Sequence, residues 1–157
     1  MEKFSGGTSE RELLRALQAN SKRSLRELAR EVGLPISTVH EKIRRLEREG
    51  IIKKYRAVLD EKRLGFLVTG FILVSIVYSV ENQTSQKRIA EKIAALPNVQ
   101  EVHIISGDWD LIVKVKAKGV DELGSFITEK LRNIHGVGKT LTAVVFETVK
   151  EEATLDV

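Results

Sequence analysis

Residues 25–52 read LRELAREVGLPISTVHEKIRRLEREGII, and this stretch decides the fold of the N-terminal part of the chain. Ser24 precedes it, and Glu27 follows Ser24 by three residues, which is the capping-box pattern that begins a helix. Gly33 predicts the end of that short helix. A second helix is predicted over residues 35–50, so the stretch contains two helices joined by a tight turn.

The second of these helices has two chemically different sides. At roughly 100° per residue, Val39, Ile43 and Leu46 point the same way and form a candidate core face. The opposite side and its flanks carry the candidate DNA-binding residues, which are Ser37, Thr38, His40, Glu41, Arg44, Arg45 and Arg48. In a major groove the N-terminal residues of such a helix reach base edges, and arginine pairs with phosphate or guanine. An ordinary solvated face with ion pairs one turn apart is the alternative.

The flanking segments complete a known arrangement. Leu13, Leu14 and Leu17 recur at helical spacing after Ser9, a candidate N-cap, and predict a preceding helix. Residues 51–58 contain β-branched and aromatic residues and predict a strand. Helix, short helix, glycine turn, basic helix and strand in this order are typical of a winged helix-turn-helix.

A run of 17 residues without charge, 64–80, opens the second half of the chain. Its length lies at the bottom of the membrane-spanning range of roughly 17–25 residues, but glycines, hydroxyl residues and β-branched residues favour one long buried strand. Because the strand alternates poorly, we expect both of its faces to be covered. Helices of the same chain can cover one face, and the other predicts a second copy, since a large exposed apolar sheet face would aggregate.

The remaining segments predict an alternation of strands and helices. A helix begins at Thr84 or Ser85 and ends before Pro97, and a second helix begins at Asp121. Strands are predicted at residues 66–80, 99–105, 110–117 and 139–149. The order βαββαβ is that of a ferredoxin-like domain, an antiparallel sheet with two helices on one face. The predicted fold class is therefore α+β.

Charge and composition divide the chain in the same way. Residues 1–65 have 16 Lys and Arg against 10 Asp and Glu, a net charge of +6, whereas residues 66–157 have 10 against 12, a net charge of −2. A basic first half predicts a polyanionic partner. The chain of 157 residues contains no cysteine, which excludes disulfides, cysteine-based zinc sites and cysteine nucleophiles. No secretion signal is recognisable, so we expect a cytoplasmic protein.

Several motifs together resemble a known family. Residues 25–52 are similar to the helix-turn-helix of the leucine-responsive and asparagine-responsive (Lrp/AsnC, "feast/famine") transcription regulators. Residues 106–110, SGDWD, resemble the Gly-Asp-aromatic-Asp loop of that family, and residues 136–150 resemble its closing strand. The resemblance covers about residues 9–150.

The resemblance implies a DNA-binding homodimer, assembling further into tetramers or octamers, that binds palindromic promoter DNA and a small amino-acid-like effector. The implied effector-binding residues are Gly107, Asp108, Trp109, Asp110, Thr140 and Thr142. The glycine permits a tight turn whose N–H groups face a carboxylate, the aspartates can hold an ammonium group, and the tryptophan can cover apolar atoms. A plain hairpin turn is the alternative for the loop.

The predicted domains are a winged helix-turn-helix at residues 1–58, a linker at 59–65, and a ferredoxin-like effector-binding and oligomerisation domain at 66–157. No nucleophile–base constellation is recognisable, and the three histidines are scattered, so we expect neither an enzyme nor a cofactor or metal. A module whose helical head binds another protein is the alternative function, and the basic head argues against it.

Overall fold

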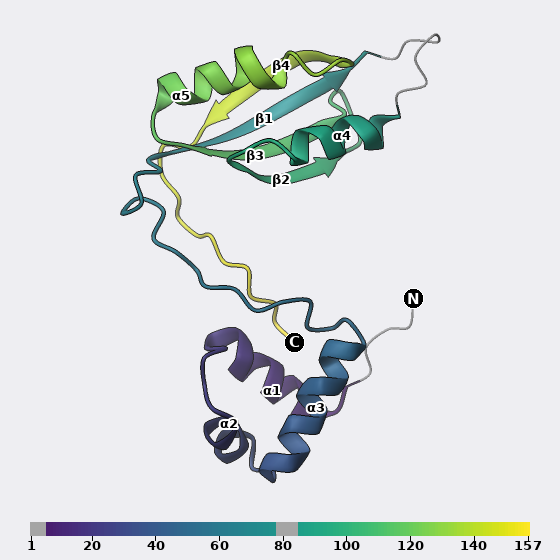
Figure 1. Ribbon diagram of the computed structural model, residues 1–157, viewed down its shortest axis with the longest axis vertical. Coiled ribbons are helices and arrows are strands. Elements are labelled where there is room, and N and C mark those ends of the chain that lie inside the picture. Colours follow the sequence, from purple (N-terminus) through teal and green to yellow (C-terminus); the bar gives the residue numbers. More distant parts are fainter. Residues whose placement is uncertain (1–5, 78–84) are drawn as a thin grey trace. The chain divides into compact units, whose positions relative to one another are not determined.

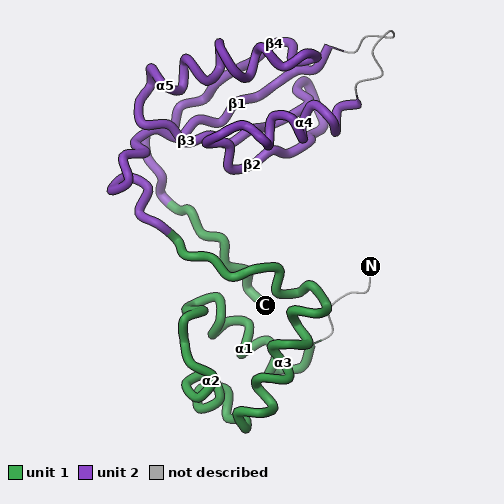
Figure 2. The backbone as a smooth tube through the Cα atoms, viewed as in Figure 1, with its two compact units in different colours: residues 1–58, 150–157 green, residues 59–149 purple. Residues whose placement is uncertain are grey.

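A computed structural model describes residues 6–77 and 85–157, and these residues form two compact units (Figure 2). The first unit contains residues 1–58 together with residues 150–157, and the second contains residues 59–149. Residues 59–65, predicted as a linker, thus group with the second unit. The final eight residues, predicted as part of the second domain, group with the first.

The first unit has three helices, α1 (Thr8–Ala19), α2 (Leu25–Val32) and α3 (Ile36–Arg48) (Figure 1). The capping box at Ser24 is formed, because its hydroxyl accepts from the Glu27 N–H at 3.3 Å and the Glu27 carboxylate accepts from the Ser24 N–H at 2.7 Å. Gly33 ends α2 with a φ of 65°, as predicted.

The start of α1 differs from the prediction. Gly7 is the N-cap of α1, with no side-chain hydrogen bond, and Ser9 lies inside the helix. The Glu10 and Arg11 N–H groups bond to the Gly7 carbonyl, which starts the helix two residues earlier than Ser9 would as a cap.

One apolar cluster holds the three helices together. Its buried members are Leu13, Leu14, Ala16, Leu17, Leu28, Ala29, Val39, Ile43 and Leu46. The helical spacing predicted the leucines of α1 and the inward face of α3 correctly. Burial of such side chains contributes roughly 1.5–3 kcal/mol each for the larger ones.

Residues 51–58 have no regular secondary structure, so the predicted strand is wrong for the described chain. Gly50 adopts a φ of 71°, and the N–H groups of Ile51 and Ile52 both bond to the Leu46 carbonyl. The segment therefore closes the end of α3. A strand needs a neighbouring backbone to pair with, and β-propensity alone does not supply one.

The second unit is a four-stranded antiparallel sheet with the strand order β2-β3-β1-β4. Its elements in chain order are β1 (Val68–Ile76), α4 (Gln86–Ala94), β2 (Val99–Ile104), β3 (Leu111–Ala117), α5 (Val120–Ser125), a π-helical turn (Phe126–Leu131) and β4 (Val137–Val144). This is the predicted βαββαβ order. Residues 78–80 and 84 of the predicted elements lie outside the described part.

The sheet has one covered face and one open face. On β1, Ile72, Val74 and Ile76 are buried with residues of α4 and α5 in one core cluster. Burial along β1 alternates strictly from Gly70 onward, so its other side chains, such as Phe71, lie on the opposite face and are half-buried. None of the described helices is long and apolar enough to cross a membrane.

Candidate nucleic-acid interface and effector loop

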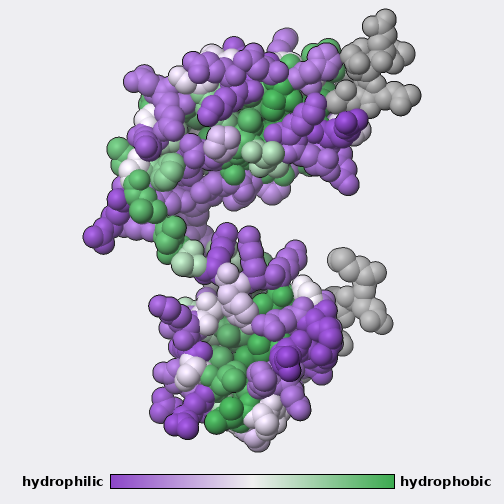
Figure 3. Space-filling view, in the orientation of Figure 1, coloured by the Kyte–Doolittle hydropathy of each residue, from purple (hydrophilic) through white to green (hydrophobic). Residues whose placement is uncertain are grey.

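The outward side of α3 carries exposed polar residues over most of its length. Val39, Ile43 and Leu46 are buried in the helical core, which fixes the orientation of the helix. Of the seven predicted DNA-binding residues, Thr38 is half-buried and the six exposed ones are Ser37, His40, Glu41, Arg44, Arg45 and Arg48. Hydrophilic residues surround the visible face of this unit, with hydrophobic residues between them (Figure 3).

Glu10 of α1 anchors one flank of α3. It is only 5% exposed, and its carboxylate is ion-paired with Lys42 at 3.3 Å and with Arg45. Arg45 also lies 3.8 Å from the Glu49 carboxylate. The Arg45 guanidinium is therefore shared between two carboxylates. Arg44 and Arg48, in contrast, have no ion-pair partner among residues 6–77 and 85–157.

A tyrosine anchors the opposite flank of α3. The Tyr55 hydroxyl donates a hydrogen bond to the Glu47 carboxylate at 2.9 Å. Burial of the ring and this bond to Glu47 raise the pKa of Tyr55 to about 12. The Tyr55 bond holds residues 53–56 beside the second half of α3. Neither flank contact was foreseen from the sequence.

The turn before α2 is set by its capping box. Hydrogen bonds from the Ser24 N–H and hydroxyl lower the pKa of Glu27 below its ordinary value, with smaller contributions from nearby arginines. Arg23 pairs with Glu31 at the other end of α2. These contacts fix the start of α2 and are local to that helix.

The loop predicted to bind the effector joins β2 to β3. Gly107 has a φ of 118°, a conformation that only glycine adopts without strain. Asp108 is exposed and Trp109 is half-buried. Asp110 accepts a hydrogen bond at 2.6 Å from the Ile76 N–H, and the Gln86 amide lies 3.4 Å from its other carboxylate oxygen. The Asp110 carboxylate is thus engaged with the end of β1 and the start of α4.

The two predicted threonines lie on β4. Thr140 pairs with Val74 and Thr142 with Ile72, so both belong to the side of the sheet that the helices cover. The Arg132 side chain donates to the Thr140 hydroxyl at 2.9 and 3.1 Å. Asp110 and Thr140 flank the same residue of β1, Val74, because Asp110 donates its N–H to the Val74 carbonyl. The structure thus places Asp110, just before β3, and Thr140, on β4, at the same level on either side of β1.

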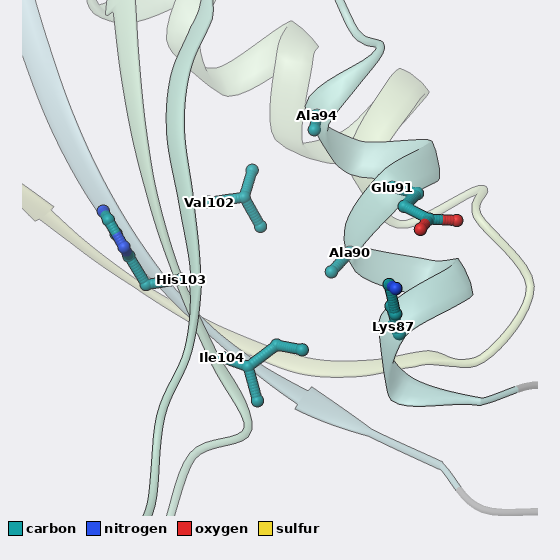
Figure 4. A pocket seen from close by; sticks show the side chains of 7 residues that line it. All are labelled: Lys87, Ala90, Glu91, Ala94, Val102, His103 and Ile104. Carbon is teal, nitrogen blue, oxygen red and sulfur yellow. The ribbon is translucent and has the colours of Figure 1, made fainter. Parts of the chain in front are cut away.

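A shallow groove of about 400 Å³ lies elsewhere, between α4 and the edge strand β2 (Figure 4). Its lining residues are Lys87, Ala90, Glu91, Ala94, Val102, His103 and Ile104. Val102 and Ile104 point towards α4, whereas His103 points away from it (Figure 4). The groove contains none of the predicted effector residues. Within the described ranges no cluster of His, Asp or Glu side chains is suited to a metal ion.

Both units match families of known proteins. Residues 8–53 match the model of a winged helix-turn-helix DNA-binding domain, and residues 69–155 match the model of the Lrp/AsnC ligand binding domain. The second match begins at β1 and covers the whole sheet, so it includes the loop at residues 106–110.

Two relatives match this chain over most of their length. An uncharacterized HTH-type transcriptional regulator of Pyrococcus abyssi is 43% identical over 143 residues, covering 91% of this chain and 94% of that protein. The HTH-type transcriptional regulator FL11 of Pyrococcus horikoshii is 34% identical over 148 residues, 94% of each chain.

Solved structures have the same fold. The transcriptional regulator NMB0573 of Neisseria meningitidis, solved as a complex with L-Met, is 22% identical and superposes with a TM-score of 0.89 over 96% of both chains. The bound L-Met belongs to the Neisseria protein. With family matches over both units and relatives of this identity and coverage, the chain belongs to the Lrp/AsnC family of transcriptional regulators, which are not enzymes.

Proposed function

We propose that this regulator binds palindromic promoter DNA as an oligomer and that a small amino-acid-like effector modulates the binding. The observation that carries the proposal is the exposed polar face of α3, held outward by the burial of Val39, Ile43 and Leu46. A helix with this distribution is suited to the major groove. A DNA partner also agrees with the expected cytoplasmic location.

The residues of α3 have different roles in this proposal. Ser37, Thr38, His40 and Glu41 lie in the N-terminal half and read base edges. Arg44 and Arg48 bind phosphates or guanine and supply most of the affinity. Arg45 contributes less to DNA binding than these two, because Glu10 and Glu49 already share its charge.

The DNA proposal is tested by selecting bound fragments and measuring their affinity at several salt concentrations. Each lost phosphate contact lowers the slope of log affinity against log salt by about 0.9. We expect Arg44→Ala and Arg48→Ala each to lower the slope by about that amount for every chain bound to the fragment. Selected fragments should contain two half-sites in inverted repeat, as the two-fold symmetry of a dimer requires. Binding that is insensitive to salt would overturn the proposal.

The open face of the sheet supports the proposed oligomer. Phe71, Leu73 and Ile112 lie on it half-buried, and Leu141 opposite Leu73 is 53% exposed. These four side chains form an apolar centre without charge. A second copy that packs the same face against it would bury this centre and relate the two chains by a two-fold axis.

Light scattering of the intact chain tests the oligomer, with a dimer or a multiple of it expected. Leu141→Asp places a charge in the proposed interface and is expected to shift the protein towards monomer. Val120→Asp is the matched control, because Val120 is 64% exposed at the start of α5, on the helical side. A monodisperse monomer for the unaltered chain, or equal shifts for both variants, would contradict the oligomer.

The loop at residues 106–110 supports the effector proposal, with roles adjusted to its geometry. We propose that Gly107 offers backbone N–H groups, Asp108 binds an ammonium group, Trp109 covers apolar atoms and Thr142 contributes from β4. Asp110 and Thr140 support the site, since both side chains are already bonded to the protein.

Trp109 is the sole tryptophan of the sequence and so reports on its own loop. We expect its fluorescence to change on addition of one or a few of the standard amino acids, and Asp108→Ala to abolish the change. Asp121→Ala, on an exposed residue of the first turn of α5, serves as the control and should keep it. A flat response across all of the standard amino acids would overturn the effector role of this loop.

A further inference from the structure

Residues 53–56 read Lys-Lys-Tyr-Arg and contain three cations within four residues. Only one other four-residue window of the sequence, Lys-Ile-Arg-Arg at residues 42–45 of α3, is as basic. All four residues are exposed, and Lys53, Lys54 and Arg56 have no ion-pair partner in the part of the chain that the structure describes. An exposed basic run is by itself an ordinary solvated segment, so its position decides what it can do.

The chain leaves α3 through a turn that keeps it close to the helix. Gly50 takes a φ of 71°, and the N–H groups of Ile51 and Ile52 bond to the Leu46 carbonyl at 2.9 and 3.1 Å. Ile52 then packs, half-buried, against the helical core. Lys53 therefore starts from a fixed point beside the last turn of α3.

Tyr55 fixes the segment a second time. Its hydroxyl donates to the Glu47 carboxylate at 2.9 Å, although its side chain remains partly exposed at 48%. Glu47 lies three residues after Arg44 and one before Arg48, so at 100° per residue it borders the outward arginine face. The bond thus holds residues 53–56 to the flank of α3 that borders the two arginines proposed to bind DNA.

We propose that residues 53–56 form a second DNA-contacting element. Lys54 and Arg56 bind backbone phosphates next to the bases that α3 reads, Lys53 adds to the same positive field, and Tyr55 is the positioning residue. The contacts are to phosphate, so they add affinity without reading sequence. This inference rests on the proposed DNA-binding function and adds a site to it.

The segment has features that an ordinary solvated charge run does not need. Three cations placed together repel one another, and nothing in residues 53–56 neutralises them. The only acidic side chain bonded to the segment is Glu47 among the described residues, and its bond goes to the uncharged tyrosine. The hydrogen bond of Tyr55 therefore fixes the position of the segment, and the three cations remain available to an anion.

The test compares two double variants of equal charge change. Lys54→Ala with Arg56→Ala removes the proposed contacts, and Lys62→Ala with Arg63→Ala removes two exposed cations from the turn at residues 60–65 of the second unit. On both a selected and a random DNA fragment, we expect the first variant to lower the salt slope by about 1.8 per bound chain, equivalent to two phosphates for each chain. The second variant should leave the slope within about 0.5 of the unaltered chain.

Tyr55→Phe tests the positioning role, because it removes the hydroxyl and keeps every charge. We expect it to lower affinity for both fragments when Lys54 and Arg56 are present and to have no further effect when both are alanine. A thermal melt of each variant verifies that the helical unit is folded. A Tyr55→Phe effect that persists in the double variant would overturn the positioning role.

The failure of this inference differs from the failure of the proposed function. If the unaltered chain binds DNA and Arg48→Ala weakens the binding, but the Lys54 and Arg56 variant equals the Lys62 and Arg63 control, the second element is refuted alone. If the unaltered chain shows no salt-dependent binding to any selected DNA, both proposals are refuted.

Discussion

Helix α3 and the loop at residues 106–110 both carry the polar side chains that the sequence marks for binding, but the two regions use them differently. On α3, Arg44 and Arg48 remain exposed and without ion-pair partners within residues 6–77 and 85–157. In the loop, Asp110 accepts the Ile76 N–H and lies beside the Gln86 amide. One region thus leaves its charges for a partner, whereas the other uses part of its polar set to hold the fold.

The difference follows from what each backbone needs. A helix satisfies its own N–H and C=O groups except at its ends, so mid-helix side chains such as Arg44 are not required as partners. A loop at the ends of central strands leaves backbone groups without ladder partners, and buried ones must find side chains. Polar residues in such a loop are therefore weaker evidence of a ligand than polar residues on an exposed helix face.

The largest expected effect is a difference in stability between substitutions of the two aspartates of the loop, Asp108 and Asp110. Asp110→Ala leaves the Ile76 N–H without its charged acceptor and is expected to lower the free energy of unfolding by about 2–3 kcal/mol. Asp108→Ala, on an exposed residue, should change it by less than about 0.5 kcal/mol. Urea unfolding measures both values. Equal losses for the two variants would mean that Asp110 has no special structural role.

The next effect concerns Glu10, the one deeply buried polar side chain among the described residues of the first unit. Glu10→Gln removes the carboxylate that pairs with Lys42 and Arg45, and we expect a loss of about 1–2 kcal/mol in stability, since both cations retain access to water. Because Arg45 is released towards solvent, affinity for random DNA should rise and the salt slope should steepen by up to about 0.9 per bound chain.

The matched control for this variant is Glu12→Gln, an exposed residue of the same helix with the same change of charge. It should shift DNA affinity only through net charge and leave thermal stability nearly unchanged. If Glu10→Gln and Glu12→Gln strengthen DNA binding equally, Glu10 does not restrain Arg45. The described residues of the first unit would then contain no buried carboxylate that holds the fold as Asp110 does in the loop.

Periodicity and capping predicted most of the framework. The spacing of Val39, Ile43 and Leu46 identified the inward face of α3, and Ser24 with Glu27 identified the start of α2. The βαββαβ order was also predictable, because each strand and helix has its own period and its own breaking residue. These features depend on residues close in sequence, which is why a sequence alone contains them.

The features that were missed depend on residues distant in sequence or on a missing partner. The strand predicted at residues 51–58 has suitable side chains but no partner strand in the described chain. The contact of Glu10 with Lys42 spans 32 positions. Its signal was nevertheless present, since Glu10 stands at helical spacing from Leu13 and Leu17, and an acid on a core stripe requires a cation.

A smaller effect tests how much the stability of the first unit depends on the N-cap of α2. Ser24→Ala removes one half of the capping box and is expected to cost about 1 kcal/mol of stability. Because the hydrogen bonds from Ser24 lower the pKa of Glu27, their contribution is complete above the ordinary value of 4.5 and is lost as the pH falls through the lowered pKa. The free energy of unfolding of the variant should thus fall less steeply than that of the unaltered chain as the pH drops below 4.5. Ser21→Ala, an exposed residue before the cap, should show neither change.

The smallest expected effect lies at high pH and tests the anchor of residues 53–56. Burial and the bond to Glu47 raise the pKa of Tyr55 to about 12 from an ordinary value of 10, so the protonated phenol is favoured in the folded chain. The stability that this bond contributes is complete below pH 10 and is lost between pH 10 and about 12. Tyr78→Phe leaves Tyr55 as the one tyrosine, and ultraviolet absorbance then follows its titration alone. Glu47→Gln should lower the measured pKa, because the carboxylate no longer opposes the phenolate. An unchanged pKa in that variant would mean that the bond does not hold residues 53–56 to α3. Of Glu10 and Tyr55, only Glu10 would then hold α3 in place, as Asp110 holds the loop.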